Sequence, residues 1–118
     1  MEATIRDKAE RGIKTYLERQ GLEIMEEGWA HGSDRIDFIA DDEGELAFID
    51  CRVNDNDGHG FADDKVDREA FERLAAAYLT EHGEIPDSRV RFDVVSMLIL
   101  SEGKGLLRHH RNALSVGD

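Results

Sequence analysis

The 118-residue sequence has a single cysteine, a single proline and no long apolar run. Because Cys51 is the one cysteine, an intramolecular disulfide, a CxxC zinc cluster and a redox pair are all excluded, and this usage is typical of a reducing cytosol. No segment reaches the roughly 18 consecutive apolar residues that a membrane span needs, and the first residues lack the apolar run of a signal peptide. We therefore expect a soluble, cytoplasmic protein with no membrane partner.

The sequence also lacks any mark of a domain boundary. It has no Gly/Ser-rich linker, no internal repeat and no low-complexity segment. Its 118 residues are enough for one hydrophobic core and too few for two independent ones. We expect residues 1–118 to form a single domain.

Basic residues are few compared with acidic ones. The 27 acidic residues against 15 basic residues give a formal net charge of −12, which is spread along the chain. Such a protein repels a polyanion on average, although a local basic patch or bound metal ions can offset the repulsion. Nucleic acid is therefore a candidate partner that we expect to bind only weakly.

The first helix is predicted over residues 4–20, where apolar side chains recur at three- and four-residue spacing. Gly21 is placed to end it. This spacing gives an amphipathic helix whose apolar stripe consists of Ile5, Ala9, Ile13, Tyr16 and Leu17.

The second helix has the clearest apolar stripe in the sequence. Asp64 or Asp67 can serve as its N-cap, and Gly83 and Pro86 follow it. One helical face collects Phe71, Leu74, Ala75, Tyr78 and Leu79.

Strands are predicted between and after the helices. Residues 22–30 form a mixed segment with some alternation, and residues 35–40 and 46–53 form an antiparallel hairpin around a turn-rich acidic segment. Residues 90–100 are β-branched and apolar, as in a buried strand, and the chain after Ser101 allows one more short strand. The predicted class is α/β, with the order α-β-β-β-α-β and a mixed central sheet flanked by helices.

A candidate metal site follows from the hairpin. Strand alternation places Asp50 and Arg52 on one face of residues 46–53, and Asp37 is expected to point opposite to its two neighbours and so to approach Asp50. Glu10 projects along the apolar stripe of the first helix. Because Mg²⁺ and Mn²⁺ favour oxygen ligands, Asp37, Asp50 and Glu10 are candidate ligands, and a bound cation would raise the melting temperature.

The pattern Asp37-x12-Asp50-Cys51-Arg52 resembles the D-x(n)-(D/E)-x-K signature of the restriction-endonuclease-like (PD-(D/E)XK) superfamily. The rest of the chain is similar to the YraN-like family of that superfamily, motif by motif and in the same order. The matching segments are Glu10 with Tyr16-Leu17 and Gly21, Gly28-Trp29, 34–40, 47–52, 75–79, 91–94 and 109–114. The resemblance implies a restriction-endonuclease-like core and a metal-dependent endonuclease whose catalytic residues are Asp37, Asp50, Arg52 and Glu10.

The chain departs from the family at the positions that carry chemistry. Asp50 stands where the family has glutamate, which shortens the reach by one methylene, and Arg52 stands where it has lysine. An arginine stays protonated and cannot help to activate water, although it can clamp a phosphate. Arg35 replaces a glutamate and Asp34 a glycine. We therefore expect phosphodiester cleavage to be weak or lost while the fold is kept.

Other interpretations are compatible with the same residues. Asp50 and Arg52 can form an ordinary exposed ion pair worth about 0–1 kcal/mol. The chain can then be a noncatalytic binding or scaffolding module, or a structural protein without a site. A basic cluster, Lys104, Arg108, His109, His110 and Arg111, can contact a phosphate backbone or form a solvated C-terminal tail.

Overall fold

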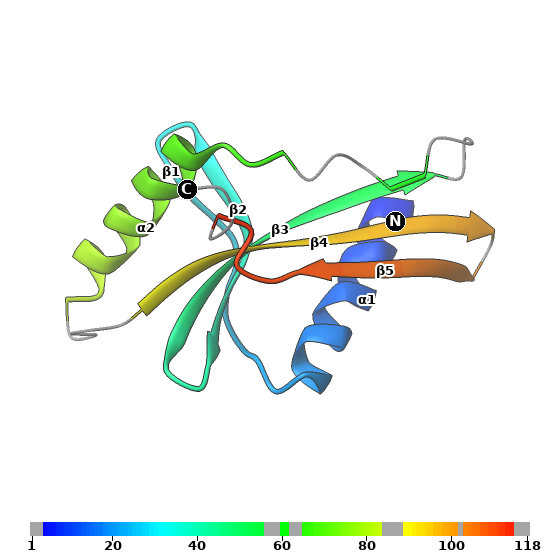
Figure 1. The fold of residues 1–118 in the computed structure, drawn as a ribbon, viewed down its shortest axis with the longest axis horizontal. Coiled ribbons are helices and arrows are strands. Elements are labelled where there is room, and N and C mark those ends of the chain that lie inside the picture. The colour runs from blue at the N-terminus through cyan, green and yellow to red at the C-terminus, as the bar shows by residue number, and fades with distance from the viewer. Residues whose placement is uncertain (1–3, 56–59, 62–64, 84–88, 102, 115–118) are drawn as a thin grey trace.

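The structure is a computed structural model that describes residues 4–55, 60–61, 65–83, 89–101 and 103–114. Five strands form one sheet in the order β1-β2-β3-β4-β5, with β3 and β4 parallel and the other neighbours antiparallel. The elements along the chain are α1 Ile5–Arg19, β1 Glu23–His31, β2 Asp34–Asp42, β3 Glu45–Asp55, α2 Arg68–Glu81, β4 Arg89–Ser101 and β5 Lys104–His110. The two helices lie on opposite faces of the sheet (Figure 1).

The predicted mixed α/β class, with helices on both faces, is confirmed. The short strand that the sequence allows after Ser101 is present as β5, which pairs with β4 over seven register partners from Val94↔His110 to Ser101↔Lys104 and extends the order to α-β-β-β-α-β-β. The basic cluster at Lys104 to Arg111 is therefore largely a sheet strand, and the solvated-tail interpretation is wrong. Its His109 side chain is only 5% exposed.

Both helices begin at the residues that their sequences indicate. Thr4 and Asp7 form a capping box at the start of α1, and Asp67 accepts from the backbone N–H of Ala70 at the start of α2. Ile5 is 57% exposed, so its predicted place in the apolar stripe is wrong. The alternative cap Asp64 and the residue Pro86 lie outside the described residues.

The sheet separates two cores, which we call the α1-side core and the α2-side core. Alternation along β3 sends Ala47, Ile49 and Cys51 to the α1-side core, and Leu46 and Phe48 to the α2-side core. Each fully buried large apolar side chain contributes roughly 1.5–3 kcal/mol to folding. The α1-side core is completed by Ile13 and Leu17, and the α2-side core by Phe71, Leu74, Ala75 and Tyr78.

The sheet divides at one point, which we call the fork. The β2–β3 ladder runs from Asp42↔Glu45 to Phe38↔Ile49 and ends there, whereas β3 remains paired with β4 as far as Asp55↔Ile99. Figure 1 shows β1 and β2 turning toward α2 while β3 continues beside β4. The fork therefore opens beyond the last pair, Phe38↔Ile49, and Asp37 and Asp50 are the first residues past it.

The side chains of β2 change faces at the fork. Ile36 packs in the α2-side core and Phe38 in the α1-side core, although regular alternation would put both on one face. Gly28, with φ of +62°, lies between the pairs Glu27↔Phe38 and Trp29↔Ile36 and so opposite Asp37. The expectation that Asp37 points opposite to both neighbours is therefore wrong, because the neighbours themselves face opposite ways.

Neither helix in the described part of the chain is long and apolar enough to cross a membrane.

Candidate functional site

Asp37 is the centre of the candidate site. Its side chain is 9% exposed, and its Oδ2 accepts a hydrogen bond of 2.7 Å from the backbone N–H of Cys51 on β3. The β2–β3 ladder has ended by this point, so the carboxylate takes the place of a ladder carbonyl. One oxygen of Asp37 thus fixes the fork, and Oδ1 is left for other partners.

Asp50 approaches Asp37 from β3, as the hairpin predicted. The pKa of Asp50 is raised by burial first and then by hydrogen-bond contact with the Asp37 carboxyl, and the charge of Arg52 offsets only part of this. Arg52 Nε donates to Asp50 Oδ2 at 3.1 Å. The raised pKa of Asp50 reflects burial and a second carboxyl group beside it, which both disfavour its charged form.

Glu10 reaches the same region from α1, through an arginine that sequence reasoning missed. Arg6 Nε lies 3.0 Å from Glu10 Oε1, and Arg6 Nη2 donates to the carbonyl of Cys51 at 3.3 Å and lies 3.7 Å from Asp37 Oδ1. The i,i+4 spacing of Arg6 and Glu10 was the available signal. Arg6 therefore links helix α1 to both strands at the fork.

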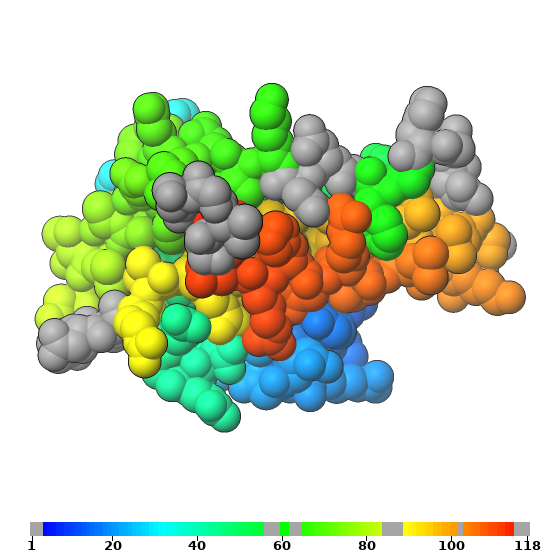
Figure 2. Space-filling view, viewed as in Figure 1, coloured from blue at the N-terminus to red at the C-terminus, as the bar shows by residue number. Residues whose placement is uncertain are grey.

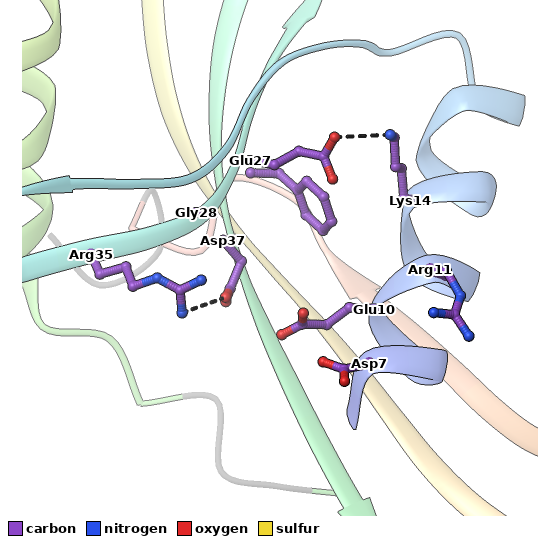
Figure 3. Close-up of a pocket in the computed structure, with 9 residues that line it drawn as sticks. Asp7, Glu10, Arg11, Lys14, Glu27, Gly28, Arg35 and Asp37 are labelled. Carbon is purple, nitrogen blue, oxygen red and sulfur yellow. Dashed lines mark hydrogen bonds and ion pairs between the residues drawn. The ribbon is translucent and has the colours of Figure 1, made fainter. Parts of the chain in front are cut away.

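Arg35 approaches Asp37 from the opposite side. Its Nη1 lies 3.8 Å from Asp37 Oδ1, and its side chain is 62% exposed. A Cβ placed on Gly28 would lie 2.9 Å from Arg35 Nη2, so the glycine leaves room for the guanidinium. Figure 3 shows Arg35 turned toward Asp37, with Glu10 and Asp7 on the far side of the pocket.

Glu10, Arg35 and Asp37 are among the residues that line a pocket of about 360 Å³ between α1 and the β1–β2 hairpin. Lys14 Nζ and Glu27 Oε2, 2.9 Å apart, bridge α1 to β1 at one side of it. Its walls carry both signs of charge, and the lining residues are Asp7, Glu10, Arg11, Lys14, Glu27, Gly28, Arg35, Asp37 and Phe38.

The charge at the fork bears on the divalent cation that the sequence implies. Each of Glu10, Asp37 and Asp50 has a guanidinium nitrogen within 4 Å, supplied by Arg6, Arg35 and Arg52, so three carboxylates face three cationic groups. Among the described residues, no three His, Cys, Asp or Glu side chains are grouped to hold a metal ion. A divalent cation would have to displace these guanidinium partners, and the predicted Mg²⁺ or Mn²⁺ site stays a prediction.

A second polar cluster lies between α1 and the β4–β5 hairpin. Asp93 is 0% exposed, and its carboxylate accepts from His109 Nε2 at 2.9 Å, from the backbone N–H of Asn112 at 2.9 Å and from Arg91 Nε at 3.1 Å. The other ring nitrogen of His109 lies 3.0 Å from the Tyr16 hydroxyl. The sequence analysis did not connect Asp93 to His109, because the two residues come from different strands.

Comparisons with known proteins agree with the pattern of motifs. The sequence model of the uncharacterised protein family UPF0102 matches residues 9–97. A UPF0102 protein of Beutenbergia cavernae is 31% identical over 105 residues, which cover 86% of this chain and 88% of the relative. A UPF0102 protein of Pelotomaculum thermopropionicum is 30% identical over 108 residues, covering 88% and 89%, and one of Halorhodospira halophila is 35% identical over 92 residues, covering 75% and 73%.

Proposed function

The chain belongs to the uncharacterised protein family UPF0102, the YraN-like proteins, and from this premise we propose that it is a restriction-endonuclease-like protein in which metal-dependent cleavage of nucleic-acid phosphodiester bonds is weak or lost. The observation that carries the proposal is the balance of charge at the fork. Carboxylates from α1, β2 and β3 lie at or beside the fork, and each already has a guanidinium partner.

Weak binding of a divalent cation is the first reason to expect weak cleavage. A divalent ion must compete with Arg6 and Arg35 for Oδ1 of Asp37, and Oδ2 is engaged by the backbone of Cys51. The three guanidinium groups also repel an incoming cation. We propose that Asp37, Asp50 and Glu10 are the residues that would hold Mg²⁺ or Mn²⁺, with low affinity.

The inability of Arg52 to accept a proton is the second reason to expect weak cleavage. Arg52 stands at the signature lysine position, keeps its proton, and is held by Asp50 and by the backbone carbonyl of Lys65. It can contact a phosphate but cannot take a proton from water.

A divalent-cation titration tests this proposal. The melting temperature of the native protein is followed with increasing Mg²⁺ or Mn²⁺, because a ligand that binds the native state stabilises it by RT ln(1 + [L]/Kd). We expect a small rise that needs millimolar cation and disappears in the Asp37→Asn, Asp50→Asn double variant. Cleavage of single- and double-stranded DNA, measured in parallel, is expected to be little or none.

Two results would contradict the proposal. Robust cleavage by the native protein that is lost in Asp37→Ala would restore a full enzyme. A cation-dependent rise in melting temperature that survives in the double Asn variant would move the metal site away from the fork.

The second candidate is a noncatalytic binding or scaffolding module that keeps the nuclease-like fold. The exposed guanidinium groups favour it, since Arg35 lines the pocket and is 62% exposed, and Arg6 beside Asp37 is 49% exposed, so both can contact an acidic ligand. In this case the cation titration gives no shift, and cleavage stays absent under every condition.

A further inference from the structure

Three residues lie opposite one another across the last three strands of the sheet. Arg52 on β3 is the register partner of Ser96 on β4, and Ser96 is the register partner of Arg108 on β5. We call Arg52, Ser96 and Arg108 the Arg-Ser-Arg row. It places one guanidinium-bearing side chain on each side of a serine.

The row faces the α2 side of the sheet. Phe48 and Val94, each an even number of residues before Arg52 and Ser96, pack in the α2-side core. Leu107 packs against the α1-side core, so its neighbour Arg108 points the other way. All three side chains of the row therefore leave the sheet on one face, beyond the residues that α2 covers.

Ser96 is unusual among the buried residues. It is 1% exposed, and within the described part of the chain its hydroxyl has no hydrogen-bond partner. Buried hydroxyl groups are paired in most native proteins, and an exception indicates a missing partner or a functional role. The unpaired hydroxyl lies between the two arginines, where a ligand oxygen would complete it.

The segment after β3 borders the row. The Arg108 guanidinium lies 4.6 Å from the centre of the Phe61 ring, and Arg52 Nη2 donates to the carbonyl of Lys65. In the space-filling view of this face, green residues of that segment lie against the orange residues of β5 (Figure 2). Arg52 Nη2 also pairs with Asp50 Oδ2 at 3.1 Å, so one guanidinium of the row is shared with a carboxylate and the other lies over an aromatic ring.

We propose that Arg52, Ser96 and Arg108 bind a phosphate group of a nucleic-acid backbone. Neighbouring strands are about 4.8 Å apart, so the arginine Cα atoms are separated by roughly 10 Å, a gap that two long guanidinium side chains close around a phosphate. Arginine suits phosphate because its planar guanidinium group donates two parallel hydrogen bonds. Ser96 supplies a third donor from below, and the Phe61 ring beside Arg108 offers a surface for a base to stack on.

This inference rests on the proposed function and deepens it, because Arg52 is shared by the row and the fork. Arg52 Nε contacts Asp50, whereas Arg108 lies two strands away from it. A backbone phosphate on the row would place the next part of the nucleic acid at Asp50. The row binds phosphate without a cation, so its failure can be separated from failure of the fork.

The test is fluorescence anisotropy of a labelled 12-nucleotide thymidine strand in low salt and EDTA, which removes any contribution of divalent cations. Arg108→Gln is expected to weaken binding about tenfold and to lower the slope of log Kd against log salt by about one, as for the loss of one phosphate contact. Arg19→Gln removes the same charge from the end of α1, far from the row, and is expected to change Kd by less than about twofold with an unchanged slope.

Ser96→Ala separates a binding role from a structural one. Removing an unpaired buried hydroxyl is expected to leave the melting temperature of the free protein unchanged or higher. The same substitution is expected to weaken oligonucleotide binding about threefold, the loss of one neutral hydrogen bond to a ligand. A residue that only filled space would not move binding and stability in opposite directions.

Two outcomes would overturn the inference. The first is an Arg108→Gln variant whose Kd and salt slope equal those of Arg19→Gln. The second is native protein that does not bind the strand in low salt, and binding of inorganic phosphate by that protein, measured by calorimetry, would assign the row to a free phosphate ion. A duplex of the same length is the companion probe, and it is expected to bind more weakly because its bases cannot stack on Phe61.

Discussion

The carboxylate of Asp93 accepts a hydrogen bond of 2.9 Å from Nε2 of His109, and this pair joins β4 to β5 inside the sheet. Asp93 and His109 are 16 positions apart in the sequence. They belong to the segments Arg91-Phe92-Asp93-Val94 and His109-His110-Arg111-Asn112. The backbone N–H of Asn112 bonds the same carboxylate. One buried aspartate therefore fixes the last strand and the turn after it.

The Asp93→Asn substitution is expected to lower the free energy of unfolding by about 3 kcal/mol. Breaking a buried charge pair typically costs roughly 3–5 kcal/mol, and the lower end applies because Arg91 keeps its contacts of 2.8 Å to Asp42 and Glu45. Urea unfolding measures the change. Glu72→Gln, which removes a carboxylate from an exposed i,i+4 pair, is the control and should stay within about 0.5 kcal/mol of native. A loss equal to that of the control would show that the cluster contributes nothing.

The Asp93 contribution is expected to disappear in acid. Burial raises the pKa of Asp93, but hydrogen bonds from His109 and the Asn112 backbone, together with the charge of Arg91, outweigh burial and lower it below its usual range. A lowered folded-state pKa gives stability that is full above the unfolded-state value of about 3.9 and is lost as the pH falls through the folded-state value. The difference in free energy of unfolding between native and Asp93→Asn should therefore shrink as the pH falls below about 4.

The opposite sign is expected for Asp50. Burial and the nearby Asp37 carboxyl raise its pKa, so its contribution to stability is full below the unfolded-state value and lost as the pH rises through the folded-state value. Asp50→Asn is thus expected to raise the free energy of unfolding at neutral pH and to give no advantage in acid. Chemical unfolding at three pH values tests this, and a destabilised variant at neutral pH would contradict it.

Glycine at position 28 is expected to matter for its backbone more than for the room it leaves. Gly28 and Gly32 have φ of +62° and +61°, and only Gly28 has Arg35 within reach of an added Cβ. Each Gly→Ala change should cost about 1–2 kcal/mol from the left-handed backbone. The two losses should agree within about 0.5 kcal/mol, because the Arg35 head is exposed and can shift. A much larger loss at Gly28 that Arg35→Ala relieves would show that the contact is rigid.

The double substitution Asp50→Glu with Arg52→Lys is expected to restore some cleavage. Glutamate extends the reach of the carboxylate. Lysine is a compact group that can lose a proton, whereas the guanidinium group of arginine stays charged. We expect a gain of about tenfold or more over native in Mn²⁺, a small part of the roughly 10²–10⁴-fold that a positioned proton-transfer group contributes. The measurement is nicking of a supercoiled plasmid, and adding Asp37→Ala should abolish the gain. No gain at all would place the defect outside these two residues.

The elements with long periodic patterns were predictable, and the irregular ones were not. The stripe from Phe71 to Tyr78 and the alternation from Leu46 to Cys51 are local patterns, and the structure confirms both. The face change between Ile36 and Phe38 comes from the end of a ladder with another strand, which no local pattern records. The same holds for Ser96, whose neighbours in space come from β3 and β5.

The acidic residues of the candidate site were predictable from the sequence, and their arginine partners were not. Asp37 and Asp50 meet because hairpin register brings them together, and register can be inferred from the turn. Arg6 reaches Asp37 from a helix 31 positions earlier (6 against 37), and this contact depends on how α1 crosses the sheet. Charge partners that come from different elements therefore need the tertiary structure, even where every residue is visible in the sequence.

The parallel pairing of β3 with β4 has a consequence for the rate at which the chain folds. All eleven register partners from Glu45↔Arg89 to Asp55↔Ile99 are 44 positions apart (45 against 89), whereas the three antiparallel pairs join neighbouring strands through short turns. Closing a long loop costs entropy before any contact rewards it, and non-local pairing slows folding. We therefore expect the three hairpin contacts to form early and the docking of the β4–β5 hairpin onto β3 to limit the folding rate.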